Sequence, residues 1–122
     1  FLAAGPTTSI RHESYQADIM RLFNLKGVIG KGGMGKTTLD YCQKSPAVYF
    51  HAIGGAAVLI ARSVKEVVGV YKLEWGVPEA MWVIRVEQLP VIVTMDAHGT
   101  SLHEQIAETS KKVLDYLIGR NA

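Results

Sequence analysis

The sequence has little cysteine, no long apolar run and little net charge, and each shortage excludes a class of protein. Its 122 residues include one cysteine, Cys42, which excludes an internal disulfide and the several thiolates of an iron–sulfur or structural zinc site. The formal net charge of +2 is too small to indicate a nucleic-acid surface. No apolar run reaches the roughly 18 residues of a membrane span, and no leader peptide is recognisable. We therefore expect a cytoplasmic protein with neither a nucleic acid nor a membrane as partner.

What is present indicates a globular α/β protein. Hydrophobic residues make up 48% of the chain and charged residues 20%, as in ordinary folded proteins. The length fits one domain, over residues 1–122, without a linker or a repeat. The chain opens with Phe1 rather than methionine, so we expect residues upstream that are missing here.

Strand-like and helix-like runs alternate along the chain, which favours helices packed on a mixed or parallel sheet. The expected strands are 1–5, 26–30, 47–53, 67–73, 83–87 and 91–95. The first expected helix begins after the capping hydroxyls of residues 7–9 and runs through residue 24. Further helices are expected at 36–44, at 56–64 and from residue 101 onward, and one helical turn is expected at 80–82. The helix at 56–64 is apolar nearly all round, as a helix packed on several sides would be. The last helix opens with a capping-box pattern and is expected to bury Leu102, Ile106, Val113 and Leu117.

Three strand ends rich in glycine lead into helices, and each is a candidate anion site. They are Gly5-Pro6-Thr7-Thr8, the run from Gly30 through Gly32 to Gly35, and Gly54-Gly55. Helix N-termini offer unpaired N–H groups, and glycine lets a ligand approach the backbone. Arg11 and Lys31 could add charge suited to a dicarboxylate. Tight turns and solvated surface cations are the alternative for each of these features.

Two further groups could transfer protons. Thr7 and Thr8 are either helix caps or, beside Arg11 and Lys31, a hydroxyl with a lowered pKa. Asp96 and His98 follow a strand end, where a proton-transfer pair and simple turn chemistry are both reasonable.

The run from Gly30 to Thr38 also fits the expression of a phosphate-binding P-loop, G-x-x-x-x-G-K-[ST]. With an early lysine, it looks like the deviant P-loop of partitioning and division-site ATPases. Pro46 limits the following helix to about two turns, and few residues are left for further strand–helix units. A nucleotide-binding ATPase therefore stays an alternative.

Five ordered motifs resemble the class I iron–sulfur fumarase β domain and the related L-tartrate dehydratase β subunit. They are Gly5-Pro6-Thr7-Thr8-x-x-Arg11, Gly30-Lys31-Gly32-Gly33-Met34, Gly54-Gly55-Ala56-Ala57, Pro78-Glu79-Ala80-Met81-Trp82 and Asp96-Ala97-His98-Gly99. The resemblance covers nearly the whole chain up to Leu102 and implies a swivelling β/β/α domain. It also implies an oligomeric assembly with an α subunit or domain that carries a 4Fe-4S cluster, to which this chain gives no ligand.

The resemblance implies a role for each matching residue. Thr7 would be the base that removes a substrate proton, while Arg11 and Lys31 would hold the carboxylates of a dicarboxylate substrate. The expected activity is the reversible hydration of fumarate to L-malate, with tartrate dehydration as the alternative, and the chain alone is expected to be inactive. Two departures are visible: no segment matches the family's upstream Thr-x-Arg-Asp-x-x-His motif, and His12 stands where the family usually has methionine.

Overall fold

A computed structural model describes residues 1–119 of the protein, so residues 120–122 of the expected domain lie outside the described part. The elements in chain order are η1 (Ser9–His12), α1 (Glu13–Leu22), β1 (Gly27–Gly30), α2 (Lys36–Lys44), β2 (Val48–Ala52), α3 (Ala57–Ser63), β3 (Val64–Tyr71), η2 (Leu73–Trp75), β4 (Met81–Val86), β5 (Val91–Met95) and α4 (Leu102–Gly119).

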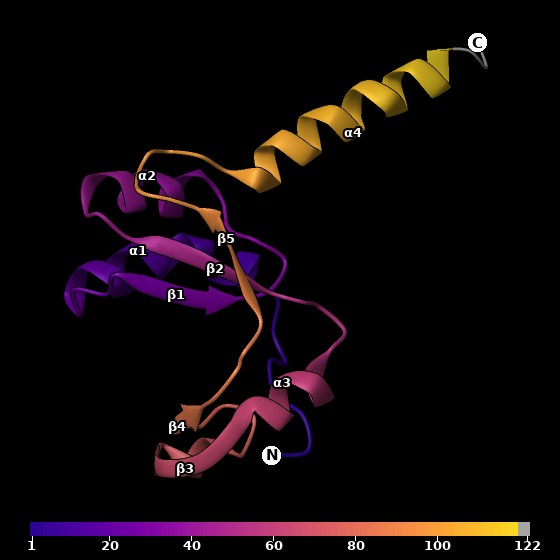
Figure 1. The fold of residues 1–122 in the computed structure, drawn as a ribbon. Helices are drawn as coiled ribbons and strands as arrows, with labels where there is room; N and C mark the ends of the chain where they lie inside the picture. Colours follow the sequence, from indigo (N-terminus) through magenta and orange to yellow (C-terminus); the bar gives the residue numbers. More distant parts are fainter. Residues whose placement is uncertain (120–122) are drawn as a thin grey trace.

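A three-stranded mixed sheet with the order β1-β2-β5 forms the centre of the molecule (Figure 1). Strands β1 and β2 are parallel and are joined through α2, whereas β5 pairs with β2 in the antiparallel direction. The carboxyl ends of β1 and β2 therefore meet at one edge of the sheet, while β5 ends at the opposite edge. The predicted α/β class, with helices packed on a mixed sheet, is confirmed.

The two faces of this sheet are packed differently. Val28 pairs with Tyr49, and Tyr49 pairs with Met95, so these side chains share one face. Tyr49 and Met95 are buried there with Met34 and Leu39 of the glycine-rich loop and α2. A second cluster joins α1 to α2 through Ala17, Met20, Tyr41, Cys42 and Ala47. The other face is more open, because its residues Ile29 and Val93 are 53% and 43% exposed.

A separate two-stranded sheet consists of β3 and β4, which pair in the antiparallel direction from Val64–Val86 to Tyr71–Met81. Figure 1 shows this hairpin beside α3, away from the central sheet. Apolar side chains on both strands remain exposed, including Val68, Tyr71 and Met81. The hairpin has therefore little apolar cover among residues 1–119.

Two predictions of local structure are wrong. Residues 1–5 form no strand. The Ala4 N–H donates to the Ala57 carbonyl at the start of α3 (3.1 Å) rather than to a neighbouring strand, and Gly5 has a positive φ of 85° that interrupts an extended chain. Residues 80–82 form no helical turn either. Met81 and Trp82 belong to β4, where pairing with Tyr71 and Val70 satisfies their backbone.

The predicted burial of two helices is also wrong, although the helices themselves are present. In α3, Val58 and Leu59 are 57% and 48% exposed, because this short helix is packed mainly against the start of β3 and the N-terminal segment. Helix α4 has no buried residue, and it extends away from the sheet in Figure 1. The four residues expected to be buried there are 38% (Leu102), 65% (Ile106), 53% (Val113) and 52% (Leu117) exposed.

The start of α4 nonetheless follows the sequence pattern, since the Glu104 N–H donates to Ser101 Oγ at 3.3 Å. No helix within residues 1–119 combines the length and the apolar character needed to cross a membrane.

Candidate functional site

A cavity of about 580 Å³ lies at the edge of the sheet where β1 and β2 end. Ile29, Gly30 and Ala52 line it from the strands, and Pro6 and Thr7 line it from the N-terminal segment. Four further polar or charged residues face it: Ser9, His12, Lys31 and Glu79. Of the ten residues that the sequence suggests as a site, Thr7, Gly30 and Lys31 are thus brought to one cavity.

Lys31 connects the glycine-rich loop to the Gly-Pro-Thr-Thr segment. Its Nζ donates a hydrogen bond to the Pro6 carbonyl at 3.3 Å, so the ammonium group lies beside the residue that precedes Thr7. An ammonium group has three donor hydrogens, and a bond to one carbonyl leaves donors for a ligand. The local arrangement can therefore bring a positive charge and a hydroxyl to one anionic molecule.

Ser9 holds the backbone of Lys31 from both sides. The Lys31 N–H donates to Ser9 Oγ at 3.0 Å, and the Ser9 N–H donates to the Lys31 carbonyl at 2.9 Å. The sequence offered Ser9 only as one of three capping hydroxyls. In the structure Thr8 is the N-cap of η1 and makes no side-chain capping bond, whereas the Ser9 hydroxyl reaches another segment.

Thr8 and Arg11 belong to the same short turn but lie away from the cavity lining. The methyl group of Thr8 packs against Gly32, where an added Cβ would lie 2.6 Å from Thr8 Cγ2. Gly32 also has a φ of +78°, so its position requires glycine for two reasons. Arg11 is exposed on η1, one residue before the cavity-lining His12.

Gly54 and Gly55 form the turn between β2 and α3. Both are exposed, and no atom lies within 4 Å of a Cβ added to either residue. Their neighbours Ala52 and Ile60 line the cavity, but these two glycines are not among its lining residues. The structure thus places them near the candidate site without a defined contact.

Asp96 and His98 lie at the opposite edge of the sheet. They follow β5, whose last residue Met95 pairs with Tyr49 near the start of β2. Asp96 Oδ1 accepts the backbone N–H groups of His98 and Thr100, both at 2.9 Å. These hydrogen bonds hold the pKa of Asp96 below its usual value, and the one from the Thr100 N–H contributes more than the one from the His98 N–H. Within the described residues this turn does not meet Thr7.

Glu13 fills the N-terminus of α2, where a P-loop would bind phosphate. Its Oε2 accepts the Gly35 N–H at 2.8 Å and the Thr38 hydroxyl at 2.7 Å, and its Oε1 accepts the Thr38 N–H at 3.1 Å. Lys36 turns instead to Asp40, with 2.8 Å between Nζ and Oδ1. An internal carboxylate and a helix-surface ion pair thus use the groups that a nucleotide would need.

A buried polar cluster lies beneath the glycine-rich loop. Tyr49 is fully buried, and its hydroxyl has no hydrogen-bond partner among the described residues. His103 Nε2 lies 2.9 Å from Thr94 Oγ1, and its ring centroid is 5.3 Å from that of His51. Burial and the neighbouring His51 lower the pKa of His103, and burial raises the pKa of Tyr49. This cluster supports the loop from below.

The chain does not fit an iron–sulfur cluster of its own. Cys42 is fully buried in the core between α1 and α2, and burial raises the pKa of its thiol. Among residues 1–119, no group of three or more His, Cys, Asp or Glu could hold a metal ion. A single inaccessible thiol cannot replace the several thiolates that such a cluster needs.

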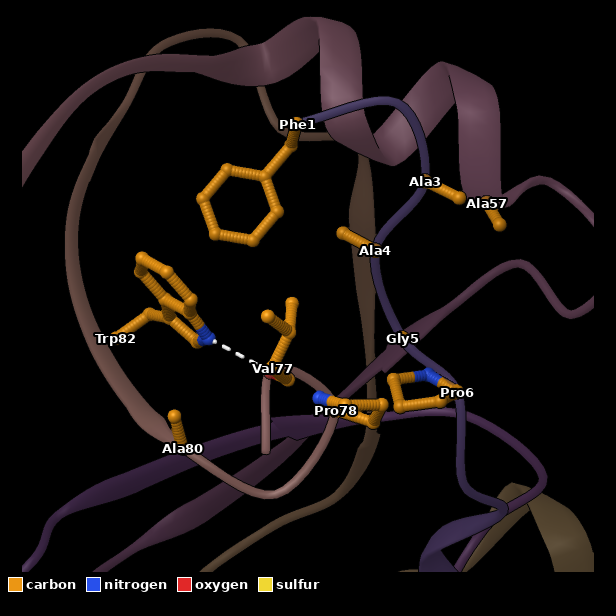
Figure 2. A pocket seen from close by; sticks show the side chains of 10 residues that line it. All are labelled: Phe1, Ala3, Ala4, Gly5, Pro6, Ala57, Val77, Pro78, Ala80 and Trp82. Atoms are coloured by element: carbon orange, nitrogen blue, oxygen red, sulfur yellow. Dashed lines mark hydrogen bonds between the residues drawn. The ribbon is translucent and has the colours of Figure 1, made fainter. Parts of the chain in front are cut away.

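A second cavity of about 510 Å³ adjoins the first and is mainly apolar. The two share Ala4, Gly5, Pro6 and Pro78 in their walls. Figure 2 shows the Phe1 and Trp82 rings on one side of it, and their centroids are 5.4 Å apart in an edge-to-face arrangement. The Trp82 Nε1–H donates to the Val77 carbonyl at 3.1 Å, which fixes the ring over the turn. The N-terminal segment thus lies between a cavity that several polar and charged side chains line and a second cavity whose side chains are almost all apolar.

Sequence reasoning missed three residues that shape the site: Ser9, Glu13 and Tyr49. Their hydrogen bonds or contacts reach residues far away in the chain, and no local pattern encodes such a partner. The one local trace of these contacts in the sequence is the glycine at position 30: an added Cβ there would collide with Ser9 Oγ and would lie 2.6 Å from the Tyr49 hydroxyl.

Comparison with known proteins gives a consistent result. The family described as "Fumarase C-terminus" matches residues 1–106. The chain is 54% identical over 112 residues to a Geobacillus stearothermophilus protein that carries the name of a class I fumarate hydratase, covering 92% of this chain and 22% of that protein. It is 43% identical over 111 residues to the L(+)-tartrate dehydratase subunit beta of Escherichia coli K12, covering 90% of this chain and 54% of the relative.

A third relative, from Methanocaldococcus jannaschii, carries the name of an L(+)-tartrate dehydratase subunit beta. It is 42% identical over 120 residues, which cover 97% of this chain and 62% of the relative. The chain therefore spans between about a fifth and three fifths of the length of these three relatives.

Proposed function

Because this chain belongs to the fumarase C-terminal family, we propose that it is the β subunit or domain of an iron–sulfur fumarate hydratase. The complete enzyme would reversibly add water to fumarate to give L-malate. The observation that carries the proposal is the placement of Thr7 and Lys31 on one cavity at the edge of the sheet. This pairing of a hydroxyl with a fixed cation suits the removal of a proton beside a carboxylate.

In the dehydration direction of this proposal, Lys31 binds one carboxylate of L-malate, and the Thr7 oxygen takes the proton from C3 while the C2 hydroxyl is the leaving group. Loss of that proton places negative charge on the neighbouring carboxylate, and a cation fixed beforehand stabilises this charge without reorganising. The Pro6 carbonyl, which accepts a hydrogen bond from Lys31 Nζ, keeps the cation next to Thr7. A neutral threonine hydroxyl cannot take this proton, so the base is the deprotonated Thr7 oxygen, and the neighbouring positive charge makes that form accessible by lowering the pKa of the hydroxyl.

Arg11 is the proposed second carboxylate ligand. It is exposed and lies outside the cavity lining, so it would meet the substrate from the rim when the α part covers the cavity. A guanidinium can bind a carboxylate with two parallel hydrogen bonds, which would orient the dicarboxylate between Arg11 and Lys31. Asp96 and His98, also suggested by the sequence, receive no support from the geometry within the described residues.

The 4Fe-4S cluster is assigned to the partner α subunit or domain, since this chain contains one buried cysteine. We accordingly expect the chain alone to be inactive and the assembly to be cytoplasmic. Fumarate is preferred to tartrate because identity is 54% to the relative named as a class I fumarate hydratase and 42–43% to the tartrate dehydratase subunits. Tartrate dehydration is the second candidate, because the tartrate dehydratase subunits are also related to this chain, at 42–43% identity.

Coexpression of this chain with its cluster-bearing α part, followed by assays of fumarate hydration and tartrate dehydration, tests the proposal. We expect turnover of fumarate and L-malate in the assembly and none with either part alone. A clear preference for tartrate would replace the first candidate with the second. An assembled, cluster-loaded complex that converts neither substrate would overturn the hydro-lyase proposal.

A further inference from the structure

We propose that Ser9 is a positioning residue that fixes Lys31 against the Thr7 segment. The inference rests on the proposed function, because it concerns how the same site holds its carboxylate-binding cation. Ser9 follows Thr7 by two residues, and it is bonded through both its backbone and its side chain to Lys31. One residue thus joins the segment that carries the base to the loop that carries the cation.

The two hydrogen bonds act on the backbone of Lys31, on both sides of its Cα atom. The N–H is held by Ser9 Oγ and the carbonyl by the Ser9 N–H, at 3.0 and 2.9 Å. With two hydrogen bonds between the same two residues, the loop cannot rotate about one of them without breaking the other. The backbone of Lys31 is therefore fixed, and its flexible side chain extends from this position to place Nζ at the Pro6 carbonyl.

Close packing around Gly30 keeps the loop in contact with Ser9. A side chain at Gly30 would collide with Ser9 Oγ, and its Cβ would lie 2.6 Å from the Tyr49 hydroxyl. At the other end of the loop, a Cβ on Gly33 would lie 2.8 Å from the ring of His103. Glycine at both positions therefore lets the loop pack directly against Ser9, His103 and the fully buried Tyr49.

Removal of the Ser9 hydroxyl should weaken substrate binding through Lys31. In Ser9→Ala the Lys31 N–H loses its acceptor, so the loop can leave its position above Tyr49. We expect KM for fumarate to rise about 10-fold, the effect of losing one hydrogen bond at a partly buried position, with kcat changed less than about 3-fold. Ser110→Ala, which removes an exposed hydroxyl on α4, is the matched control and should leave both constants unchanged.

The decisive experiment is a double-mutant cycle of Ser9→Ala and Lys31→Ala in the assembled, cluster-loaded enzyme. A residue that acts through Lys31 has nothing to position once the ammonium group is gone. We therefore expect the double variant to have the KM of Lys31→Ala. Hydrogen exchange of the 30–33 segment, measured by mass spectrometry in the same assemblies, should be faster in Ser9→Ala than in the Ser110→Ala control.

The outcomes separate this inference from the proposed function. If Lys31→Ala raises KM but the Ser9→Ala effect is absent, or adds to it in full, the positioning role is overturned and the function stands. If Lys31→Ala leaves KM unchanged, the carboxylate-binding role of Lys31 fails, and this inference fails with it. Should Ser9→Ala reduce assembly, Ser9→Cys, which keeps the size but weakens the acceptor, carries the same cycle with the same expected results.

Discussion

The turn after β1 and the turn after β5 both place polar groups at the end of a strand of the same sheet, but they direct these groups differently. After β1, the Lys31 ammonium group lies on a cavity and its backbone is held by Ser9 from another segment. After β5, the carboxylate of Asp96 turns back to the N–H groups of His98 and Thr100.

The difference shows how a site can be told from a turn. A polar side chain whose hydrogen bonds are satisfied by its own turn stabilises that turn and has less capacity for a ligand. A charged group that is anchored by its backbone keeps its own donors available. Substitutions in these turns, in the N-terminal segment and at the start of α2 test this contrast.

The largest expected effect is on turnover. Thr7→Ala removes the proposed base at the β1 side and should lower kcat of the assembled enzyme about 10³-fold while the fold persists, because Thr7 is exposed. His98→Ala, at the β5 side, should change kcat by less than about 3-fold, in the range of a surface substitution. Steady-state assays and circular dichroism of both variants provide the measurement.

Either reversal would break the comparison. Wild-type turnover in Thr7→Ala would remove this residue from the mechanism. A large loss in His98→Ala, with the assembly intact, would show that the β5 turn reaches the substrate in the complete enzyme and would restore the original prediction for that residue.

The next effect concerns the packing of the glycine-rich loop. Gly30→Ala forces a methyl group against Ser9 and Tyr49 and should lower the free energy of unfolding by about 1–3 kcal/mol, as overpacking does. Gly54→Ala is the control, since an added Cβ meets no atom within 4 Å, and should remain within about 0.5 kcal/mol. Denaturant unfolding measures both. Equal losses in the two variants would show that the loop is not tightly packed.

A smaller effect is expected at the start of α2. Glu13→Gln keeps the size of the side chain but replaces the carboxylate, which accepts three hydrogen bonds at this helix terminus, with a neutral amide. This change should lower the free energy of unfolding by about 1–2 kcal/mol. Glu108→Gln on the exposed surface of α4 is the matched control. Thermal unfolding compares the two. If Glu13→Gln instead left the melting temperature unchanged and the variant bound ATP with magnesium, the P-loop alternative would regain support.

The smallest effect is the pH dependence contributed by Asp96. Its hydrogen bonds lower its pKa in the folded state below the ordinary 3.8, so its stabilising contribution is complete above that value and disappears as the pH falls through the lowered pKa. The melting temperature of wild type should therefore exceed that of Asp96→Asn near neutral pH, and the gap should close in acid. A gap that does not change with pH would rule out this carboxylate as the cause.

Much of the local structure could be predicted from particular residues. Pro46 ended α2, Ser101 capped α4 as its pattern indicated, and the strands around Ile29, Phe50 and Val93 lie close to their predicted positions. The burial of α4 was predicted wrongly because an apolar stripe shows which face can be buried, not whether another element lies against it.

The five motifs by themselves determined the family, and the alternation of strands and helices determined the α/β class. Both are encoded in neighbouring residues, through the identity of glycine and threonine at fixed spacing and through hydrophobic periodicity. Only the tertiary structure decided that Glu13 caps α2, that Ser9 holds Lys31, and that Asp96 ends at the opposite edge of the sheet from Thr7. The physical reason is that these relations depend on strand direction and on side chains meeting 22 or more residues apart, which no local pattern specifies.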